Sequence, residues 1–321
     1  MSGDPFTRHR GLATWGERLV ALDEFRGAAA RSGRSLDARD RVRAVAEYRA
    51  ARPDGCAVEG PFSRVAIFGG VYSNHRALEA LLDDAARRGA EALCCLGDLG
   101  GFGPSPERVR PLLDQGAVRT IAGNYEESLA AGRDDCACGY TDPRDNRFAL
   151  LSYRYTAEHT SDEWKTWMRA LPRRRRVAVG KREALLVHGS PRRVNEFLFA
   201  STTSDAYLET LLEQERCAAL FCTHTGLHWH RRLPSGGDAV NVGVLGRPAN
   251  DGDSRVWYCI AEDRGARLGV ELVPLAYDRA ALVAEMRRER LPEEFVETVL
   301  TGWWTTCLEV LPARERSRSR Y

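Results

Sequence analysis

The chain has 321 residues, of which 43% are hydrophobic and 29% charged, and its 47 basic and 45 acidic residues leave a net charge of +2. This length can bury a large core, and the composition is ordinary for a globular protein. No apolar run approaches the roughly 20 residues that a membrane helix needs, and the N-terminus lacks the apolar segment of a secretory signal. We therefore expect a cytoplasmic protein with no membrane partner, and the balanced charge makes nucleic acid an unlikely one.

Two local features depart from this average. Basic residues run from Arg173 to Arg176 and recur in the tail ARERSRSRY; such runs are usually solvated faces. The nine cysteines are an odd number spread along the chain, which argues against a disulfide framework. We expect any cysteine with a special role to be a ligand or a redox group.

Hydrophobic periodicity predicts the first elements in chain order. Residues 12–51 have helical periodicity, and RPDGCAVEGP, residues 52–61, is predicted to be a linker. From residue 64 onward, short apolar runs alternate with amphipathic helices. Strands are predicted at RVAIF, EALCCL and VRTIAG, with a helix after each of the first two. This βαβαβ order predicts a sheet with helices on both faces.

Residues 127–160 interrupt that order with DDCACGYTDPRDN, an excursion that we interpret as a lid. Strands resume at RRVAVG, EALLVHG, CAALFCTH, DAVNVG, SRVWYCIA and RLGVELVPL, with a helix at 204–215, and the chain after Tyr277 is predicted to be helical. Trp303, Trp304 and Cys307 are predicted to be buried packing residues. The chain divides into a helical N-terminal extension with a linker (1–61), an α/β domain (62–275) with an insertion at about 127–160, and a helical C-terminal extension (276–321).

Polar residues follow four of the predicted strands. They occur in the sequence motifs GDLGGFGP, GNYEE, HGSP and THTG. In open α/β sheets, loops from different strands converge beyond their carboxyl ends, which is the usual ligand site. One carboxylate, one amide and two imidazoles there predict a divalent metal site with mixed oxygen and nitrogen ligands. The predicted ligands are Asp98, Asn124, His188 and His224.

The order and the residues of these motifs resemble those of the calcineurin-like metallophosphoesterases, especially their compact bacterial branch. That family's pattern runs D-x-H-G-N, G-D-x-x-x-x-G-P, G-N-H-D or G-N-Y-D, H-G-S-P, G-H-T-H and N-P-G-S-x-G-x-P. The corresponding motifs here are GVYSN, GDLGGFGP, GNYEE, HGSP, THTG and NVGVLGRP, over about residues 64–260. The resemblance implies a four-layer α/β/β/α sandwich and hydrolysis of a phosphoester by a metal-activated water.

The resemblance also implies two metals bridged by Asp98, but the ligands of one metal are substituted. Gly70 stands where the family has its first Asp, and Tyr72 stands where it has its first His. Gly226 stands where the family has the last His of the fifth motif, G-H-T-H. The set for the other metal is intact. The turn keeps Asn74, and the family resemblance makes three residues candidates for catalysis, namely Tyr125 in place of a proton-donating His, Asn74, and Glu126 in place of Asp.

Nearby residues are candidates for rebuilding the lost metal site or for binding substrate. Tyrosinate, thiolate and imidazole all bind transition metals, and the candidates here are Tyr72, Cys136, Cys138, His228 and His230, with Cys95 near the same crevice. His228 and His230 also alternate as on a strand, which fits surface positions. Guanidinium groups match phosphate oxygens in pairs, so the candidate substrate ligands are Arg192, Arg193 and Arg247.

The sequence favours a metal-dependent phosphoesterase with one or two divalent ions (Mn, Zn or Fe) and a small phosphorylated or other small-molecule substrate. One alternative keeps the scaffold and changes the chemistry, with iron or another transition metal running redox or oxygen-dependent reactions. Another is a degenerate member that binds a ligand without turnover. An oligomer is compatible with all three.

Overall fold

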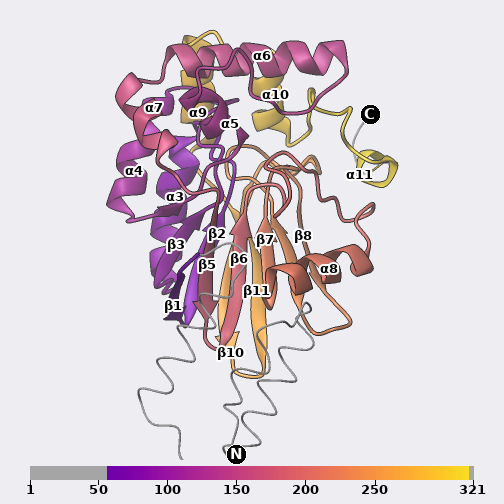
Figure 1. Ribbon diagram of the computed structural model, residues 1–321. Helices are drawn as coiled ribbons and strands as arrows, with labels where there is room; N and C mark the ends of the chain where they lie inside the picture. Colours follow the sequence, from indigo (N-terminus) through magenta and orange to yellow (C-terminus); the bar gives the residue numbers. More distant parts are fainter. Residues whose placement is uncertain (1–55, 318–321) are drawn as a thin grey trace, which may run out of the picture. The chain divides into compact units, whose positions relative to one another are not determined.

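Two β-sheets lie face to face at the centre of the chain in the computed structural model, which describes residues 56–317 (Figure 1). The five-stranded sheet has the order β11-β10-β2-β3-β4. Its parallel part comprises β2 (Arg64–Phe68), β3 (Ala92–Cys95) and β4 (Arg119–Thr120), and β10 (Val256–Arg264) pairs antiparallel with β2 and with β11 (Arg267–Leu275). The helix predicted over residues 12–51 lies outside the described residues.

The six-stranded sheet has the order β1-β5-β6-β7-β9-β8. β6, β7 and β9 run parallel, whereas β5 and β8 pair antiparallel with β6 and β9. The strands of this sheet are β1 (Val58–Phe62), β5 (Arg174–Val179), β6 (Arg182–Val187), β7 (Ala219–Cys222), β8 (His228–Arg232) and β9 (Asp238–Val242).

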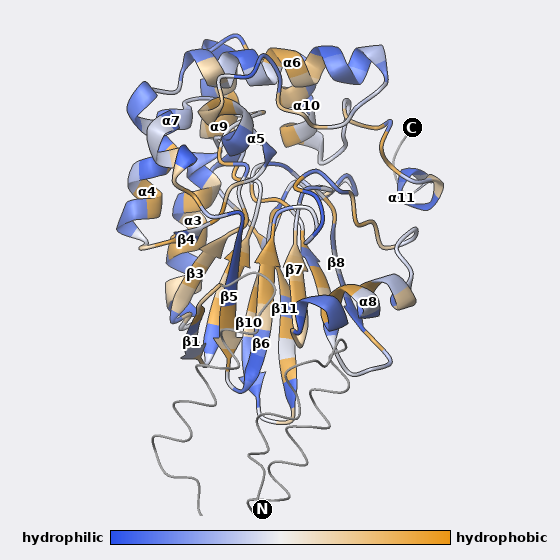
Figure 2. Cartoon of the chain, viewed as in Figure 1, coloured by the Kyte–Doolittle hydropathy of each residue, from blue (hydrophilic) through white to orange (hydrophobic). Residues whose placement is uncertain are grey.

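The strand β2 shows why the structure has layers on both sides of each sheet. Successive side chains of a strand point to opposite faces. Val65 and Ile67 pack in the core between the two sheets, while Ala66 and Phe68 pack in the core beneath the helices. All four side chains are fully buried, and the apolar strand centres are evident in Figure 2. A strand buried on both faces has a continuous apolar sequence.

Helices cover the outer face of each sheet. α3 (His75–Arg87) and α4 (Val109–Gln115) pack on the five-stranded sheet, where Leu78, Leu81 and Leu113 join Phe68 in one core. α8 (Asp205–Glu215) covers the six-stranded sheet through Leu208 and its neighbours. The order of layers is therefore α/β/β/α, which confirms the predicted fold class.

A cap of further helices lies over the end of the sheets at which the loops after β2, β3 and β7 emerge (Figure 1). The helices of the cap are α5 (Asn124–Ala130), α6 (Pro143–Glu158), α7 (Asp162–Arg169), α9 (Arg279–Arg288) and α10 (Glu293–Thr301). Phe148 of α6 meets Phe295 of α10 in the core of this cap. The remaining short helices are η2 (Pro106–Arg108) and α11 (Ala313–Ser317). Over residues 56–317, no helix has both the length and the apolar character needed to cross a bilayer.

The structure corrects one sequence prediction about the start of the domain and adds detail to another region. The predicted linker 52–61 contains most of β1, an edge strand that pairs parallel with β5. Gly60 and Pro61 indicated a break, but proline is tolerated on edge strands because one side of such a strand has no ladder. The excursion 127–160, for which no helix or strand was predicted, contains α6, a helix of 16 residues.

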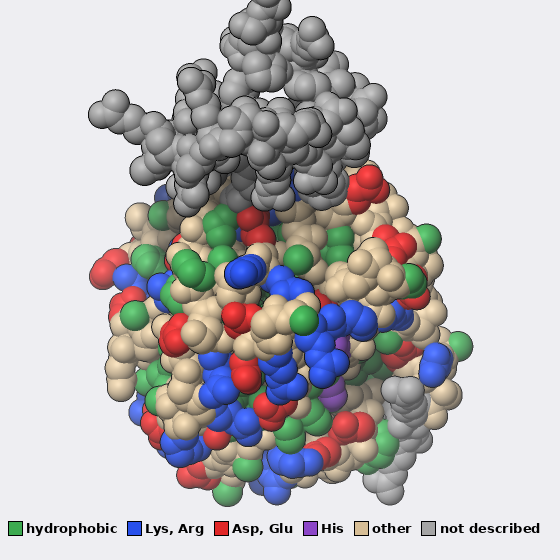
Figure 3. All heavy atoms as spheres, turned by 90° about the horizontal axis from the view of Figure 1, so that it is seen from below, with side chains coloured by type: hydrophobic (Ala, Val, Ile, Leu, Met, Phe, Trp, Pro, Cys, Tyr) green, Lys and Arg blue, Asp and Glu red, His purple; other side chains and the backbone are tan. Residues whose placement is uncertain are grey.

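The basic run at 173–176 is only partly the solvated face that its composition indicated. Arg173 is exposed, but Arg176 is completely buried in β5 and pairs with Glu183 at 3.0 Å and Glu215 at 3.2 Å. A buried guanidinium is retained only when carboxylates and backbone oxygens compensate it. On the face shown in Figure 3, Lys and Arg side chains are likewise interspersed with Asp and Glu.

Candidate metal centre

Three ionisable side chains meet beyond the carboxyl ends of strands from both sheets. Asp98 follows β3 of one sheet, and His188 and His224 follow β6 and β7 of the other. All three are buried, and their ligand atoms lie within 4.8 Å of one another. Asn124, the first residue of α5, joins them with its Oδ1 atom 3.1 Å from Nε2 of His188. The four predicted ligands are therefore neighbours in space.

The tautomer of His188 fixes what this cluster offers to a ligand. Its Nδ1 lies 2.6 Å from the carbonyl oxygen of Leu96, which can only accept, so Nδ1 carries the proton. Burial opposes charge on this ring, yet the adjacent Asp98 raises its pKa above the ordinary value. A metal would bind the neutral form, in which Nε2 presents its lone pair to the cluster. Oδ2 of Asp98 lies 3.3 Å from this nitrogen, and Nδ1 of His224 lies 3.1 Å from it. More lone pairs than protons converge here, an arrangement that a divalent cation satisfies.

The side-chain amide of Asn124 is oriented by the chain beyond α5. Its Nδ2 atom donates a 2.8 Å hydrogen bond to the carbonyl oxygen of Cys136. Because the amide nitrogen is held there, the amide oxygen faces His188. Groups that orient a ligand in this way commonly accompany metal sites.

The backbone at the cluster is held in a conformation that side chains disfavour. Asp98 has φ of 57° and His224 has φ of 66°, both in the left-handed region. Such strain concentrates at functional sites, where the surrounding structure enforces it. Gly123 allows the close approach of the loops, since a Cβ atom there would lie 2.4 Å from Oδ1 of Asp98 and 2.8 Å from Cε1 of His188.

The electrostatics of the cluster favour an ionised aspartate and a neutral second histidine. Burial opposes charge on Asp98, yet the adjacent His188 brings the pKa of that carboxyl below its ordinary value. Burial, assisted by the charge of His188, lowers the pKa of His224 to about 3. At neutral pH, His224 therefore keeps a lone pair on a ring nitrogen.

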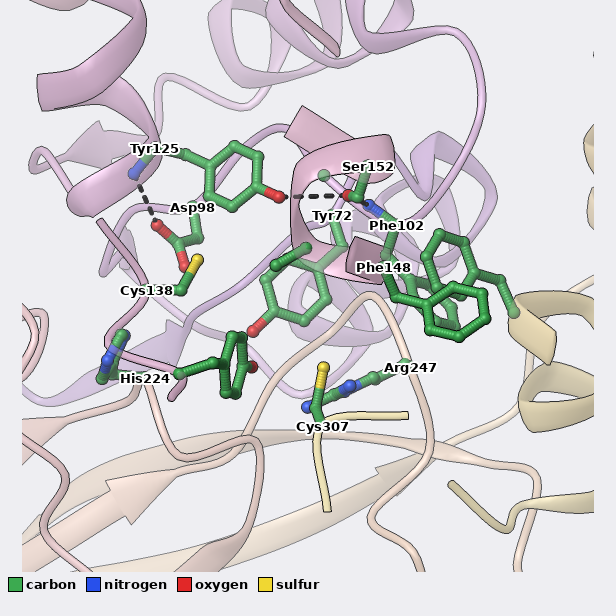
Figure 4. Close-up of a pocket in the computed structure, with 14 residues that line it drawn as sticks. Tyr72, Asp98, Phe102, Tyr125, Cys138, Phe148, Ser152, His224, Arg247 and Cys307 are labelled. Carbon is green, nitrogen blue, oxygen red and sulfur yellow. Dashed lines mark hydrogen bonds between the residues drawn. The ribbon is translucent and has the colours of Figure 1, made fainter. Parts of the chain in front are cut away.

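A pocket opens beside the cluster and is built by segments far apart in the sequence (Figure 4). Asp98 and His224 form one side, and Figure 4 shows Arg247 and Cys307 together on another, with Tyr72 between. α6 contributes Phe148, Ala149 and Ser152 to the wall, and Phe295 comes from α10. The remaining lining residues are Gly101, Phe102, Tyr125, Cys138 and Tyr140.

The comparison with known families decides the identity of this arrangement. The calcineurin-like phosphoesterase superfamily domain matches residues 64–262, more than half of the chain. The chain belongs to the calcineurin-like phosphoesterase superfamily. This match confirms the resemblance found in the six sequence motifs, and the low identities to known relatives fit a divergent member.

Similar proteins match almost their whole length to this chain. A metallophosphoesterase from Sphaerobacter thermophilus is 25% identical with a TM-score of 0.58, and the match covers 75% of this chain and 99% of that one. A hypothetical protein from Pyrococcus horikoshii OT3 is 22% identical with a TM-score of 0.63, over 75% and 99%. An uncharacterized protein of Methanocaldococcus jannaschii is 23% identical over 250 residues, 75% of this chain and 98% of its own.

The half of the superfamily site that the sequence substitutes is filled by other side chains. A Cβ atom on Gly226 would lie 2.7 Å from Cη2 of Trp304 and 3.1 Å from Nη2 of Arg247. A Cβ atom on Gly70 would lie 2.5 Å from Cγ1 of Val244 and 3.1 Å from Cζ of Tyr72. The structure has therefore closed the space into which the superfamily's Asp and His would project.

The three candidate catalytic residues occupy different surroundings. Tyr125 lines the pocket, and its hydroxyl lies 3.0 Å from Oγ of Ser152. Asn74 is the N-cap of α3, accepts from the amide of Ala77 at 3.0 Å and donates to the carbonyl of Gly246 at 3.3 Å. Both ends of its amide serve the turn, and Asn74 does not line the pocket.

Glu126 also serves the backbone. Its carboxylate accepts from the amides of Asp98 and Leu99 at 2.8 Å and of Gly123 at 2.7 Å. Burial, with the charge of Asp98, raises its pKa to about 6. By joining the loops after β3 and β4, this side chain positions Asp98 and does not face the pocket.

The candidates for a rebuilt metal site are dispersed. Cys136 and Cys138 are bonded to each other in a disulfide, so neither sulfur is the free thiolate that the candidate metal site requires. His228 stacks on Trp257 with ring centroids 3.7 Å apart, and Nε2 of His230 lies 2.8 Å from Oδ1 of Asp238. Of the five candidates, Tyr72 and Cys138 line the pocket.

The three candidate arginines are separated in the same way. Arg192 is exposed and donates to the hydroxyl of Tyr207 at 2.8 Å, and Arg193 is exposed as well. Arg247 is buried and lines the pocket. Only this arginine of the three therefore lines the same pocket as Asp98 and His224.

Sequence reasoning missed several residues of the pocket. Tyr140 and Ser152 belong to the excursion, and Cys307 belongs to a segment that was interpreted as packing only. Trp304 does pack, with 1% exposure, but the neighbouring chain turns Cys307 into the pocket. The excursion and the C-terminal segment meet at Asp145, whose carboxylate accepts from the amides of Cys307 at 2.7 Å and Glu309 at 3.0 Å. No periodicity signals such a contact between distant segments.

Proposed function

We propose that this chain is a metal-dependent phosphoester hydrolase. The ion would be held by Asp98, Asn124, His188 and His224. The observation that supports this most strongly is the convergence of Oδ2 of Asp98, Oδ1 of Asn124 and Nδ1 of His224 about Nε2 of His188, with the amide of Asn124 and the ring of His188 both oriented by backbone carbonyls. When bound, a divalent cation such as manganese, zinc or iron supplies Lewis acidity and makes water a better nucleophile at neutral pH.

The chain's own groups define the rest of the reaction. The pKa values of Asp98 and His224 are both lowered, so at neutral pH Asp98 is ionised and His224 is neutral. Neither group has to lose a proton before it can bind a cation. Tyr125 is the candidate proton donor for the leaving oxygen. Burial raises the pKa of its phenol further above the ordinary value near 10, so it carries its proton at neutral pH. Ser152 orients this hydroxyl from α6.

The aromatic walls of the pocket limit the substrate. Phe102, Phe148 and Phe295 form an apolar side, and α6 with the C-terminal segment closes the top. A narrow pocket with a few polar groups favours a small organic phosphate over a polymer. A cytoplasmic location remains our proposal from the composition.

The first experiment is metal analysis of the purified full chain, combined with hydrolysis assays. We expect about one equivalent of manganese, zinc or iron, as one set of ligands is intact, and metal-dependent hydrolysis of p-nitrophenyl phosphate. A chain that carries metal but hydrolyses neither this monoester nor bis(p-nitrophenyl) phosphate would contradict the proposal and favour a binding protein.

A second candidate function is redox chemistry at the same centre. The observation that favours it is the presence of the phenols of Tyr72 and Tyr140 and the free thiol of Cys307 around one pocket. Phenolate and thiolate ligands give iron and copper intense visible absorption. A coloured protein whose spectrum changes on anaerobic reduction would support this candidate, whereas a colourless manganese or zinc protein would exclude it.

A further inference from the structure

The guanidinium of Arg247 is a buried cation with no carboxylate partner. Its residue is 6% exposed, and Nε has no hydrogen-bond partner. No aspartate or glutamate within residues 56–317 forms an ion pair with it; its ionisable neighbours are Cys307, Tyr72 and Tyr140. Burying an unpaired charge is costly. Such a group at the wall of a pocket therefore indicates an anionic ligand.

Aromatic rings hold this guanidinium in place. Its Cζ atom lies 3.6 Å from the ring centroid of Trp304, and the rings of Tyr72 and Phe102 lie 5.8 and 5.9 Å away. Trp304 is itself fixed, since its Nε1 donates to the carbonyl of Pro248 at 2.7 Å and its amide donates to Oδ1 of Asn250 at 2.8 Å. The stacked plane leaves the N–H donors at the edge of the guanidinium to partners in its own plane; Cys307 is one such partner, and Nε has none.

The position of Arg247 coincides with the substituted half of the superfamily site. Its Nη2 lies 3.1 Å from the position that a Cβ atom on Gly226 would take, and Tyr72 stands at another substituted position. In this half of the site, the residues that would bind a cation are replaced by residues that carry N–H and O–H donors. Burial raises the pKa of Tyr72 and of Tyr140, so both phenols remain neutral donors.

We propose that Arg247 takes over the role of a second metal ion by binding the non-bridging oxygens of a phosphate monoester, with the hydroxyls of Tyr72 and Tyr140 as further donors. This inference rests on the proposed function for the nature of the anion. Charge favours a monoester over a diester. A divalent ion, Arg247 and ionised Asp98 sum to two positive charges, and a monoester near pH 7 carries about −1.5 to −2.

The test measures the affinity of the full-length, manganese-loaded protein for inorganic phosphate by isothermal titration calorimetry. Arg247→Met keeps an apolar stem against Trp304 and removes the charge. We expect its affinity to fall on the order of tenfold to a hundredfold, as for loss of charged hydrogen bonds. Arg247→Lys keeps the charge without the planar guanidinium, and its affinity for phosphate should lie between those of wild type and Arg247→Met. The control Arg255→Ala removes an exposed arginine that pairs with Asp253 and should bind as wild type does.

Two results would overturn the inference. One is a wild-type protein that binds no phosphate, and the other is a folded Arg247→Met variant, with unchanged manganese content, that binds phosphate as tightly as wild type. If Arg247→Met does not fold, Arg247→Lys decides, because an unchanged affinity there contradicts a role for the guanidinium fork. Phosphate binding that depends on Arg247 in a protein without hydrolysis would reject the proposed function alone. Hydrolysis with an unchanged KM for p-nitrophenyl phosphate in Arg247→Met would reject this inference alone.

Discussion

Gly226 and the indole of Trp304 are in such close contact that no side chain fits between them. A Cβ atom on Gly226 would lie 2.7 Å from Cη2 and 2.9 Å from Cζ2 of Trp304. Trp304 comes from the C-terminal extension, outside the residues that match the superfamily. The extension therefore occupies the space of a superfamily metal ligand.

Restoring that ligand should not restore a second metal. We expect Gly226→His to bind no additional manganese and to lose roughly 1–3 kcal/mol of unfolding free energy through overpacking, measured by urea denaturation and elemental analysis. Gly226 also has φ of 77°, whereas Gly236 has φ of 88° and no atom within 4 Å of the position that a Cβ would take. Gly236→Ala is thus the control for backbone strain, expected to cost about 1 kcal/mol. A second equivalent of metal in Gly226→His would contradict this interpretation.

Removal of one proposed ligand should empty the metal centre. We expect His188→Ala to weaken metal binding by more than the roughly ten- to hundredfold seen when a group that only orients a ligand is lost. The measurement is competition with a chelator, followed by elemental analysis. His230→Ala is the matched control, since His230 on β8 pairs with Asp238 of β9 and its loss should leave the metal content unchanged. Equal metal loss in both variants would mean that the centre has been assigned wrongly.

The phenol of Tyr125 can be tested without changing the packing. Tyr125→Phe removes the hydroxyl 3.0 Å from Ser152 and should lower kcat by about 10²–10⁴ if it protonates the leaving group, with KM and metal content preserved. Tyr153→Phe is the control. Its ring packs 5.7 Å from that of Tyr125, but its hydroxyl bonds the carbonyl of Arg133. The proton-donor role fails if both variants keep full kcat.

The disulfide should support the metal centre indirectly. Cys136 supplies the carbonyl that orients Asn124, and its sulfur is bonded to that of Cys138. We expect the double substitution Cys136→Ser and Cys138→Ser to weaken metal binding by roughly tenfold, because the loop is freed. Cys56→Ser provides a control for loss of a thiol elsewhere. Unchanged metal affinity would show that the loop keeps its shape without the sulfur bond.

Asp145 should hold the C-terminal segment over the pocket. Asp145→Ala leaves the amides of Cys307 and Glu309 without their acceptor, and we expect a loss of roughly 1–3 kcal/mol in stability. Hydrogen exchange should increase at residues 304–311. The exposed Asp134 forms no hydrogen bond or ion pair in the described chain, so Asp134→Ala is the control. Protection that persists in Asp145→Ala would show that Trp304 alone anchors the segment.

The sequence by itself determined most of the strands and the identity of the proposed metal ligands. Strands such as RVAIF are apolar on both faces because they are buried between a sheet and a helix, and this pattern is visible without coordinates. Asp98, Asn124, His188 and His224 each follow a strand, and parallel strands bring their carboxyl ends together. Local signals of this kind depend on neighbouring residues only.

Only the tertiary structure decided which other residues share the pocket. Of the three candidate arginines, Arg247 alone lines it, and no local pattern distinguishes it from Arg192. Cys307 and Trp304 reach the site because Asp145 binds the backbone of the C-terminal segment across more than 160 residues of chain. Contacts between segments so far apart depend on complementary surfaces, and these exist only after the chain has folded.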